Sequence, residues 1–202
     1  MADGKTKLTS LPIERDDEVG KLVRGFNFLI AKLRREEVAR RESDERLKFM
    51  AHHDALTGLY NRVMLEEHLQ QALARAERDN TQIALLFCDL DGFKIINDQY
   101  GHDVGDEVLR QVATRLLLDR RRVDTVARLG GDEFVILLSG LEDARTAASH
   151  VAQQCLAAIN VPFEIDGKSL TLGISIGIAL HTGKAVAPSC LMSKADIAMY
   201  LS

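Results

Sequence analysis

The sequence contains little cysteine, no long apolar run and no excess of positive charge. Its three cysteines, Cys88, Cys155 and Cys190, lack the spacing of a metal site, which predicts reduced thiols and a cytosolic setting. No stretch of eighteen apolar residues occurs and no signal peptide opens the chain, so the sequence as given predicts a cytoplasmic polypeptide. A net charge of −4 argues against a general nucleic-acid binder.

What is present suits one globular domain with an appendage. The chain has 202 residues, of which 46% are hydrophobic and 28% charged. Residues 1–15 are polar and irregular, residues 16–50 follow one long helical pattern, and residues 51–202 alternate between apolar runs and helical periods. We therefore expect a folded domain over 51–202 that is preceded by a long N-terminal helix.

The long helix carries a heptad repeat. Acids at residues 16–18 open it, where the helix dipole favours negative charge. The apolar positions are Val19, Leu22, Phe26, Leu29 and Leu33, and the same register continues through Glu36, Arg40, Ser43, Leu47 and Met50. This pattern favours a parallel dimeric coiled coil with a polar middle. The alternative is a single amphipathic helix packed on its own domain.

The remaining residues predict a ferredoxin-like sheet. The nearly continuous apolar run 83–90 is typical of a central strand covered on both faces. Turn signals at Gly130-Gly131 and Asp166-Gly167 predict hairpins over 123–138 and 162–178. Helices are predicted at 62–78 (with Asn61 as N-cap), after residue 92, and at 107–118, 141–160 and 193–200, with a loop over 100–106. The order β-α-β-β-α-β indicates an α/β (α+β) fold of the ferredoxin-like type.

Two acidic turns stand out at predicted strand ends. Asp132 and Glu133 follow the glycine pair, where a backbone without Cβ atoms lets a ligand approach closely. Asp89 ends the strand that begins near residue 83. Carboxylates from two strand ends, together with a backbone carbonyl, are ligands for Mg²⁺, which usually indicates phosphate chemistry. The alternative for the hairpin is a charged tip without a role.

The residues after Asp89 add nucleotide-binding chemistry. Phe93 and Lys94 open a helix, where free backbone N–H groups can hold phosphate oxygens. Asn97 and Asp106 carry the donors and acceptors that read a purine edge, because a carboxylate accepts the two N–H bonds that guanine offers. Taken singly, Asn97 could be a surface helix residue and Asp106 a helix N-cap.

These residues carry a resemblance to a known family. Residues 89–109, residues 128–134 (Arg-Leu-Gly-Gly-Asp-Glu-Phe) and residues 54–62 resemble the GGDEF family of diguanylate cyclases, although Tyr60 stands where that family usually has proline. The similarity extends from about His53 to Tyr200. It implies a nucleotidyl-cyclase-like fold, and it implies an enzyme that condenses two GTP molecules into cyclic di-GMP with release of pyrophosphate.

The resemblance also implies roles for individual residues. Asp89, Asp132 and the backbone carbonyl of Leu90 would bind Mg²⁺ (or Mn²⁺), and Asp132 would also act as the base for the attacking 3′-hydroxyl. Glu133 would be a catalytic-site residue that supports the turn and the metal shell. Asn97 and Asp106 would read guanine. Because each domain holds one GTP, the chemistry would require a homodimer, and the N-terminal coiled coil would bring the two domains together.

A regulatory site is implied as well. Arg121 and Asp124 match the RxxD inhibitory site of the family, at which cyclic di-GMP binds and blocks the productive encounter of two domains. Arginine suits bidentate contact with phosphate or guanine. The alternative function is a non-catalytic module that binds cyclic di-GMP or GTP and acts through a partner.

The two ends of the sequence carry further expectations. Residues 11–22, with Phe26 and Asn27, are similar to the second half of a HAMP linker, which implies a parent protein anchored at the cytoplasmic face of the inner membrane. After Tyr200 the family continues into a Lys and Arg segment that contacts the triphosphate, whereas this sequence stops at Ser202. We therefore expect weak cyclase activity from the 202 residues, or an inactive fragment of a larger receptor. A phosphodiesterase domain after Tyr200 is a further possibility that the sequence leaves open.

Overall fold

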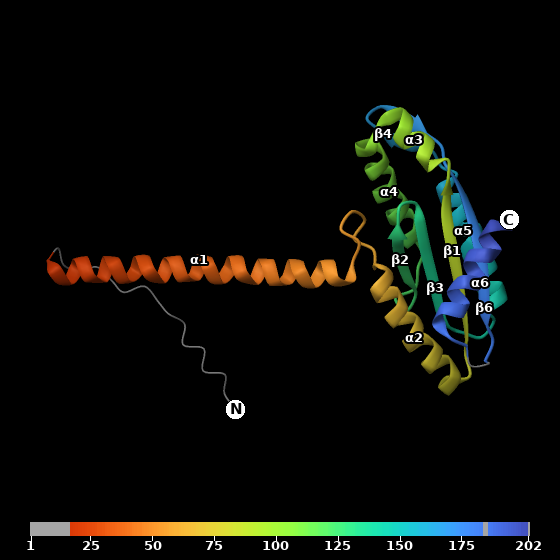
Figure 1. Ribbon diagram of the computed structural model, residues 1–202, viewed down its shortest axis with the longest axis horizontal. Coiled ribbons are helices and arrows are strands. Elements are labelled where there is room, and N and C mark those ends of the chain that lie inside the picture. The colour runs from red at the N-terminus through yellow and green to blue at the C-terminus, as the bar shows by residue number, and fades with distance from the viewer. Residues whose placement is uncertain (1–16, 184–185, 202) are drawn as a thin grey trace. The chain divides into compact units, whose positions relative to one another are not determined.

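The computed structural model describes residues 17–183 and 186–201 (Figure 1). The chain divides into two compact units between Phe49 and Met50, and each unit is described by itself. The predicted irregular segment 1–15, and the part of the HAMP-like segment before Asp17, lie outside the described residues.

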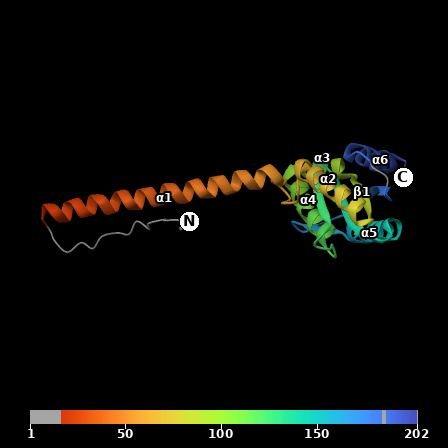
Figure 2. The same cartoon turned by 90° about the horizontal axis from the view of Figure 1, so that it is seen from below.

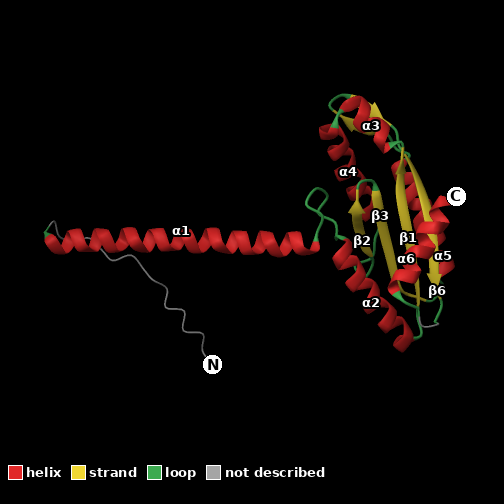
Figure 3. Ribbon diagram, viewed as in Figure 1, coloured by secondary structure: helices red, strands yellow, loops and turns green. Residues whose placement is uncertain are grey.

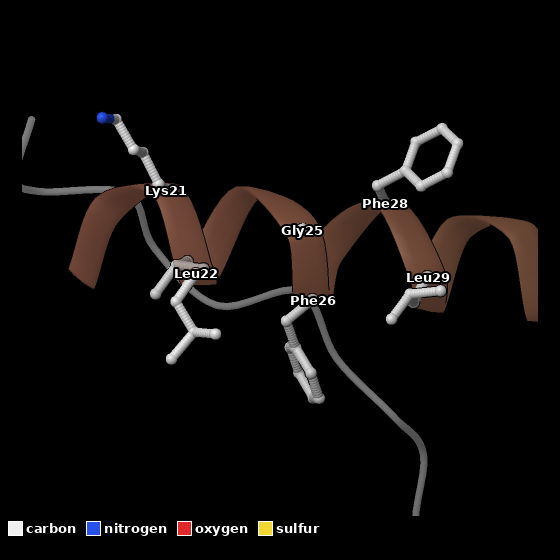
Figure 4. Close-up of a pocket in the computed structure, with 7 residues that line it drawn as sticks. Lys21, Leu22, Gly25, Phe26, Phe28 and Leu29 are labelled. Carbon is white, nitrogen blue, oxygen red and sulfur yellow. The ribbon is translucent and has the colours of Figure 1, made fainter. Parts of the chain in front are cut away.

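The first unit consists of most of helix α1 (Glu18–His52). The Asp17 carboxylate accepts hydrogen bonds from the backbone N–H groups of Val19 (3.1 Å) and Gly20 (3.2 Å), which caps the first turn. Leu22, Phe26 and Leu29 project on the same side of the helix and are exposed (Figure 4). The helix is as long as the heptad pattern predicts, while pairing with a second copy stays a prediction. In the described part of the chain, no helix is both long and apolar enough to cross a membrane.

The second unit is built on a four-stranded antiparallel sheet (Figure 3). Its strands are β1 (Gln82–Asp91), β2 (Thr125–Gly130), β3 (Glu133–Leu141) and β6 (Gly173–His181), in the order β2-β3-β1-β6. This is the strand order of a ferredoxin-like fold, so the predicted fold class is confirmed. Strand β1 has a hydrogen-bonded neighbour on each side and is buried on both faces, and the burial of both faces explains its almost continuous apolar sequence.

Helices cover both faces of the sheet. Alternate residues of β1 point to opposite faces, with Leu86 and Cys88 in the core under α3, α4 and α5, and Leu85 and Phe87 in the core under α2 and α6. Helices α5 and α6 accordingly lie on opposite sides of β1 (Figure 2). Both acidic turns therefore stand on a sheet that is buried from two sides.

Helix α2 (Arg62–Asp79) begins as predicted, since the Asn61 side chain accepts a hydrogen bond from the N–H of Met64 (3.1 Å).

The loop predicted over residues 100–106 is wrong. Helix α3 (Phe93–Tyr100) is followed directly by α4 (His102–Leu117), and only Gly101 separates them. With φ at 87°, Gly101 adopts a conformation that other residues rarely adopt, and one such residue is sufficient to end one helix and start the next.

Two other boundaries differ from the sequence prediction. The hairpin predicted over 162–178 is only β4 (Phe163–Ile165) and β5 (Lys168–Leu170), because the second arm divides and β6 pairs with β1 instead. The turn itself is as predicted, with positive φ at Asp166 and Gly167. Helix α5 (Ala144–Ile159) lies within its predicted range, whereas α6 (Pro188–Tyr200) starts five residues earlier than predicted, with proline in its first turn.

Candidate active site at the ends of β1 and β3

Three acids meet where β1 ends and β3 begins. Asp89 of β1 pairs in register with Glu133 of β3, and Asp132 lies in the turn between β2 and β3. Burial raises the pKa of Asp89, and the negative charges of Asp132, Glu133 and Asp91 raise it further. The structure therefore brings together the acids that the sequence singled out, close enough to repel one another.

The donor atoms at this point fit a hard divalent cation that is only partly held by protein. Among the described residues, no group of three or more His, Cys, Asp or Glu side chains forms a ready metal cage. The oxygens on offer are the carboxylates of Asp89 and Asp132 and the backbone carbonyl of Leu90, whose side chain is buried in the core. Mg²⁺ is usually bound through one or two carboxylates, with water and substrate phosphates completing its shell, so these residues fit the predicted ion.

Hydrogen bonds from Arg128 fix the turn that carries Asp132. The Arg128 guanidinium donates to the Gly131 carbonyl through Nε (3.0 Å) and Nη2 (2.7 Å), and to Asp54 Oδ1 through Nη1 (2.9 Å). The Arg128 side chain is only 10% exposed and that of Asp54 22%. One guanidinium thus links the segment after α1 to the residue that precedes Asp132.

Asp54 is itself tightly bound. It accepts hydrogen bonds from the Thr57 backbone N–H (2.9 Å) and hydroxyl (2.6 Å). Burial alone would raise the pKa of Asp54, but the hydrogen bonds from Thr57 and Arg128 outweigh burial and lower it. Sequence reasoning assigned no role to Asp54 or Arg128. The sequence did offer a signal, because Asp54 lies in the motif 54–62 and Arg128 in the motif 128–134, and opposite charges in two such motifs could form an ion pair in the fold.

The first turn of α3 offers the predicted backbone donors. Its N-cap is Gly92, which has φ at 83° and no side chain to bond the N–H groups of the turn. The Phe93 ring is buried in the core, so only its backbone N–H can serve a ligand, whereas Lys94 is exposed. Phe93 and Lys94 directly follow the Asp89-Leu90-Asp91-Gly92 strand end.

Asn97 and Asp106 lie on two helices that meet at Gly101. Asn97 is on α3 and Asp106 is the fifth residue of α4, so its alternative role as an N-cap is wrong. The Asn97 side chain reaches the backbone of Gly105, the residue before Asp106, so closely that no Cβ would fit there. Both predicted guanine-reading residues are half-buried. The structure thus places the Asn97 amide beside the backbone of Gly105, which directly precedes Asp106.

Arg121 and Asp124 form an ion pair at the other end of β2 from the acidic turn. Arg121 Nη2 lies 2.8 Å from Asp124 Oδ1, and Arg121 Nε lies 3.2 Å from Oδ2. The Asp124 side chain is 3% exposed while that of Arg121 is 50% exposed. Asp124 thus orients the guanidinium, whose exposed part is available to a ligand.

Comparison with known proteins agrees with this arrangement. Residues 51–202 match the family described as diguanylate cyclase, GGDEF domain. The bifunctional diguanylate cyclase/cyclic di-GMP phosphodiesterase MucR of Pseudomonas aeruginosa is 46% identical over 151 residues, which cover 75% of this chain and 22% of that protein. Diguanylate cyclase TpbB of the same organism is 39% identical over 186 residues, which cover 92% of this chain and 42% of that protein. The chain therefore spans less than half the length of these two relatives.

Solved structures give the same result. The GGDEF domain of TpbB superposes with a TM-score of 0.71 at 43% identity, covering 74% of this chain and 87% of that one. The coiled coil and GGDEF domain of DgcB from Caulobacter crescentus, in complex with c-di-GMP, superposes with a TM-score of 0.73 at 27% identity, covering 88% of this chain and 93% of that one. The chain belongs to the diguanylate cyclase GGDEF-domain family.

Proposed function

We propose that the chain is a diguanylate cyclase, which condenses two molecules of GTP into cyclic di-GMP and releases two molecules of pyrophosphate. The observation that carries the proposal is the convergence of Asp89, Asp132 and Glu133 at one end of β1 and β3. Crowded carboxylates raise the free energy of the folded state, and a bound divalent cation offsets that repulsion. Family membership supports the same activity.

The proposed metal ligands are Asp89, Asp132 and the Leu90 carbonyl, with Glu133 adding negative charge beside them. Bound there, Mg²⁺ or Mn²⁺ would neutralise the triphosphate and stabilise pyrophosphate as it leaves. Support comes from the all-oxygen donor set and from the raised pKa of Asp89, whose causes are burial and the neighbouring acids. The Asp132 carboxylate then takes the proton of the attacking 3′-hydroxyl.

The remaining site residues hold the nucleotide. The backbone N–H groups of Phe93 and Lys94, at the uncapped start of α3, donate to phosphate oxygens. The Lys94 ammonium adds positive charge on the exposed side of the same turn. Asn97 and Asp106 hydrogen-bond the guanine edge, and their placement on adjoining helices supports this assignment.

The reaction joins two nucleotides, so two domains must face each other. We propose a homodimer through α1, whose exposed Leu22, Phe26 and Leu29 share one side of the helix. The relative DgcB, which contains a coiled coil next to its GGDEF domain, supports this. The HAMP-like residues before and within α1 support a membrane-anchored parent protein, with this part on the cytoplasmic side.

A second candidate function is binding of cyclic di-GMP, either as feedback inhibition of the cyclase or as the sole activity. The Arg121–Asp124 pair favours it, because an oriented and half-exposed guanidinium suits the phosphates of a cyclic dinucleotide. Structures of DgcB in complex with c-di-GMP support the same assignment. Feedback inhibition predicts that Arg121→Ala leaves the initial rate unchanged and removes the slowing that accumulated product causes.

The test is to incubate the purified protein with GTP and Mg²⁺ and to quantify cyclic di-GMP by chromatography. Product from the wild type and none from Asp132→Asn is the expected result. The matched control is Glu77→Gln, which removes a negative charge from the exposed side of α2 and should leave the rate unchanged. Binding of cyclic di-GMP without any product from GTP would support the binding module and contradict the cyclase.

A further inference from the structure

Gly105 lies where the Asn97 side chain leaves no room for a Cβ atom. It is a buried residue in the second turn of α4, and its N–H donates to the Gly101 carbonyl (3.2 Å) as in a regular helix. A methyl group at this position would overlap Asn97 Oδ1 and lie 3.0 Å from Asn97 Cγ. The Asn97 carboxamide therefore occupies the space that any other residue would fill.

The backbone gives no reason for glycine at this position. Gly105 does not have the positive φ that Gly101 and Gly92 have. Glycine inside a helix destabilises it relative to alanine, because it loses more conformational freedom on folding. The next nearest atom to a methyl group would be Phe93 Cζ at 3.4 Å, an ordinary van der Waals distance. Within the described part of the chain, Asn97 is thus the one neighbour of Gly105 that an alanine at residue 105 would disturb strongly.

We propose that Gly105 is a positioning residue for base specificity, which lets the Asn97 carboxamide lie against α4 in the position that reads guanine. This rests on the proposed function, in which Asn97 contacts the base. A methyl group at residue 105 forces Asn97 to rotate away, and this is cheap for the fold because only the end of a side chain moves. Stability and base recognition should therefore change in opposite directions.

The choice of nucleotide follows from the displaced atom. Asn97 Oδ1 accepts hydrogen bonds, and the 2-amino group is the donor that separates guanine from hypoxanthine. Affinity for a guanine nucleotide should fall when Oδ1 moves, whereas affinity for a hypoxanthine nucleotide should change little. If Gly105 had a purely structural role, Gly105→Ala would weaken the binding of both nucleotides alike.

The experiment measures binding of 3′-deoxy-GTP and 3′-deoxy-ITP, in the presence of Mg²⁺, to the full chain by calorimetry. Neither probe can be turned over, because both lack the attacking hydroxyl. Gly105→Ala should weaken the guanine probe about tenfold, the size of one or two lost hydrogen bonds, and leave the hypoxanthine probe within about twofold. The matched control is Gly25→Ala in α1, where a methyl group meets nothing within 4 Å beyond the adjoining residues and backbone of its own helix, and both affinities should stay unchanged.

A double variant tests whether Gly105→Ala acts on guanine affinity through Asn97 alone. Truncation of Asn97 to alanine removes the two atoms that would lie closest to a methyl group at Gly105, so Gly105→Ala should cause no further loss of guanine affinity in an Asn97→Ala background. The melting temperature of each protein that carries Gly105→Ala should equal or exceed that of the same protein with glycine at residue 105, in both the wild-type and the Asn97→Ala background.

Three results would overturn the inference: no guanine preference in the wild type, guanine preference retained in Gly105→Ala, or equal loss for both probes with a lowered melting temperature. Binding does not depend on turnover, so the two proposals fail separately. A wild type that prefers the guanine probe but makes no cyclic di-GMP contradicts the cyclase and leaves the role of Gly105 intact.

Discussion

Replacing Arg128 by lysine tests whether a single guanidinium holds the turn that carries Asp132. Arginine donates to the Gly131 carbonyl at 3.0 and 2.7 Å and to Asp54 at 2.9 Å. Lysine keeps the charge, but its ammonium lacks the planar fork that serves both acceptors. Hydrogen bonds that involve a charged group contribute ~1.5–3 kcal/mol each, so we expect the free energy of unfolding to fall by about 2 kcal/mol.

The same substitution should slow the chemistry more than it weakens binding. Gly131 immediately precedes Asp132, and a displacement of about 1 Å at a reacting group can cost on the order of 100-fold in rate. We expect kcat for cyclic di-GMP formation to fall about 10- to 100-fold, with a smaller change in KM. Urea denaturation gives the stability and an initial-rate assay with GTP gives kcat. In the control Arg110→Lys, the exposed pair with Glu107 should contribute less than about 0.5 kcal/mol and leave kcat unchanged.

The reasoning is refuted if Arg128→Lys has the stability and kcat of the wild type. A fall in stability with unchanged kcat per folded molecule would show that Arg128 supports the fold and not the position of Asp132. A double-mutant cycle with Asp54→Asn should give a coupling energy of about 1 kcal/mol or more, because both residues belong to one hydrogen-bond network.

Three further predictions concern charge and association. Asp89→Asn removes repulsion with Asp132 and Glu133, so the melting temperature without metal should rise, and the rise that Mg²⁺ causes in the wild type should disappear. Ionised Asp54 has a lowered folded-state pKa, so its contribution to stability is complete above about pH 3.8 and is lost as the pH falls through that lower pKa. Asp54→Asn should therefore flatten the acid side of a plot of unfolding free energy against pH. Leu29→Glu should shift the sedimentation of the full chain toward monomer and lower the rate per chain, and an unchanged dimer would contradict a seam through that residue.

The sequence predicted the sheet well because its signals are local. A buried central strand shows as an apolar run, and a tight hairpin shows as Asp166-Gly167 or Gly130-Gly131, whatever the rest of the fold does. The failures occurred where a tertiary contact decided the outcome. Gly105 suggested a loop, yet it lies inside α4, where its missing side chain makes room for Asn97.

The candidate site was predictable in its acids but not in its support. Asp89 and Asp132 could be paired from the sequence because each ends a strand of one expected sheet. The contact between Arg128 and Asp54 spans 74 residues and depends on how the segment before α2 folds against β2, which no local pattern encodes. The hairpin predicted over 162–178 was also wrong because of a long-range contact: β6 pairs with the open edge of β1 over nine residues.

The most direct test of the central claim is the stoichiometry of the reaction. The protein is incubated with GTP and Mg²⁺, and cyclic di-GMP and pyrophosphate are quantified together over a range of protein concentrations. The account predicts two pyrophosphates for each cyclic di-GMP, at a rate per chain that rises with protein concentration until the dimer is complete. A folded protein that binds GTP and yields no cyclic di-GMP at any concentration would contradict it.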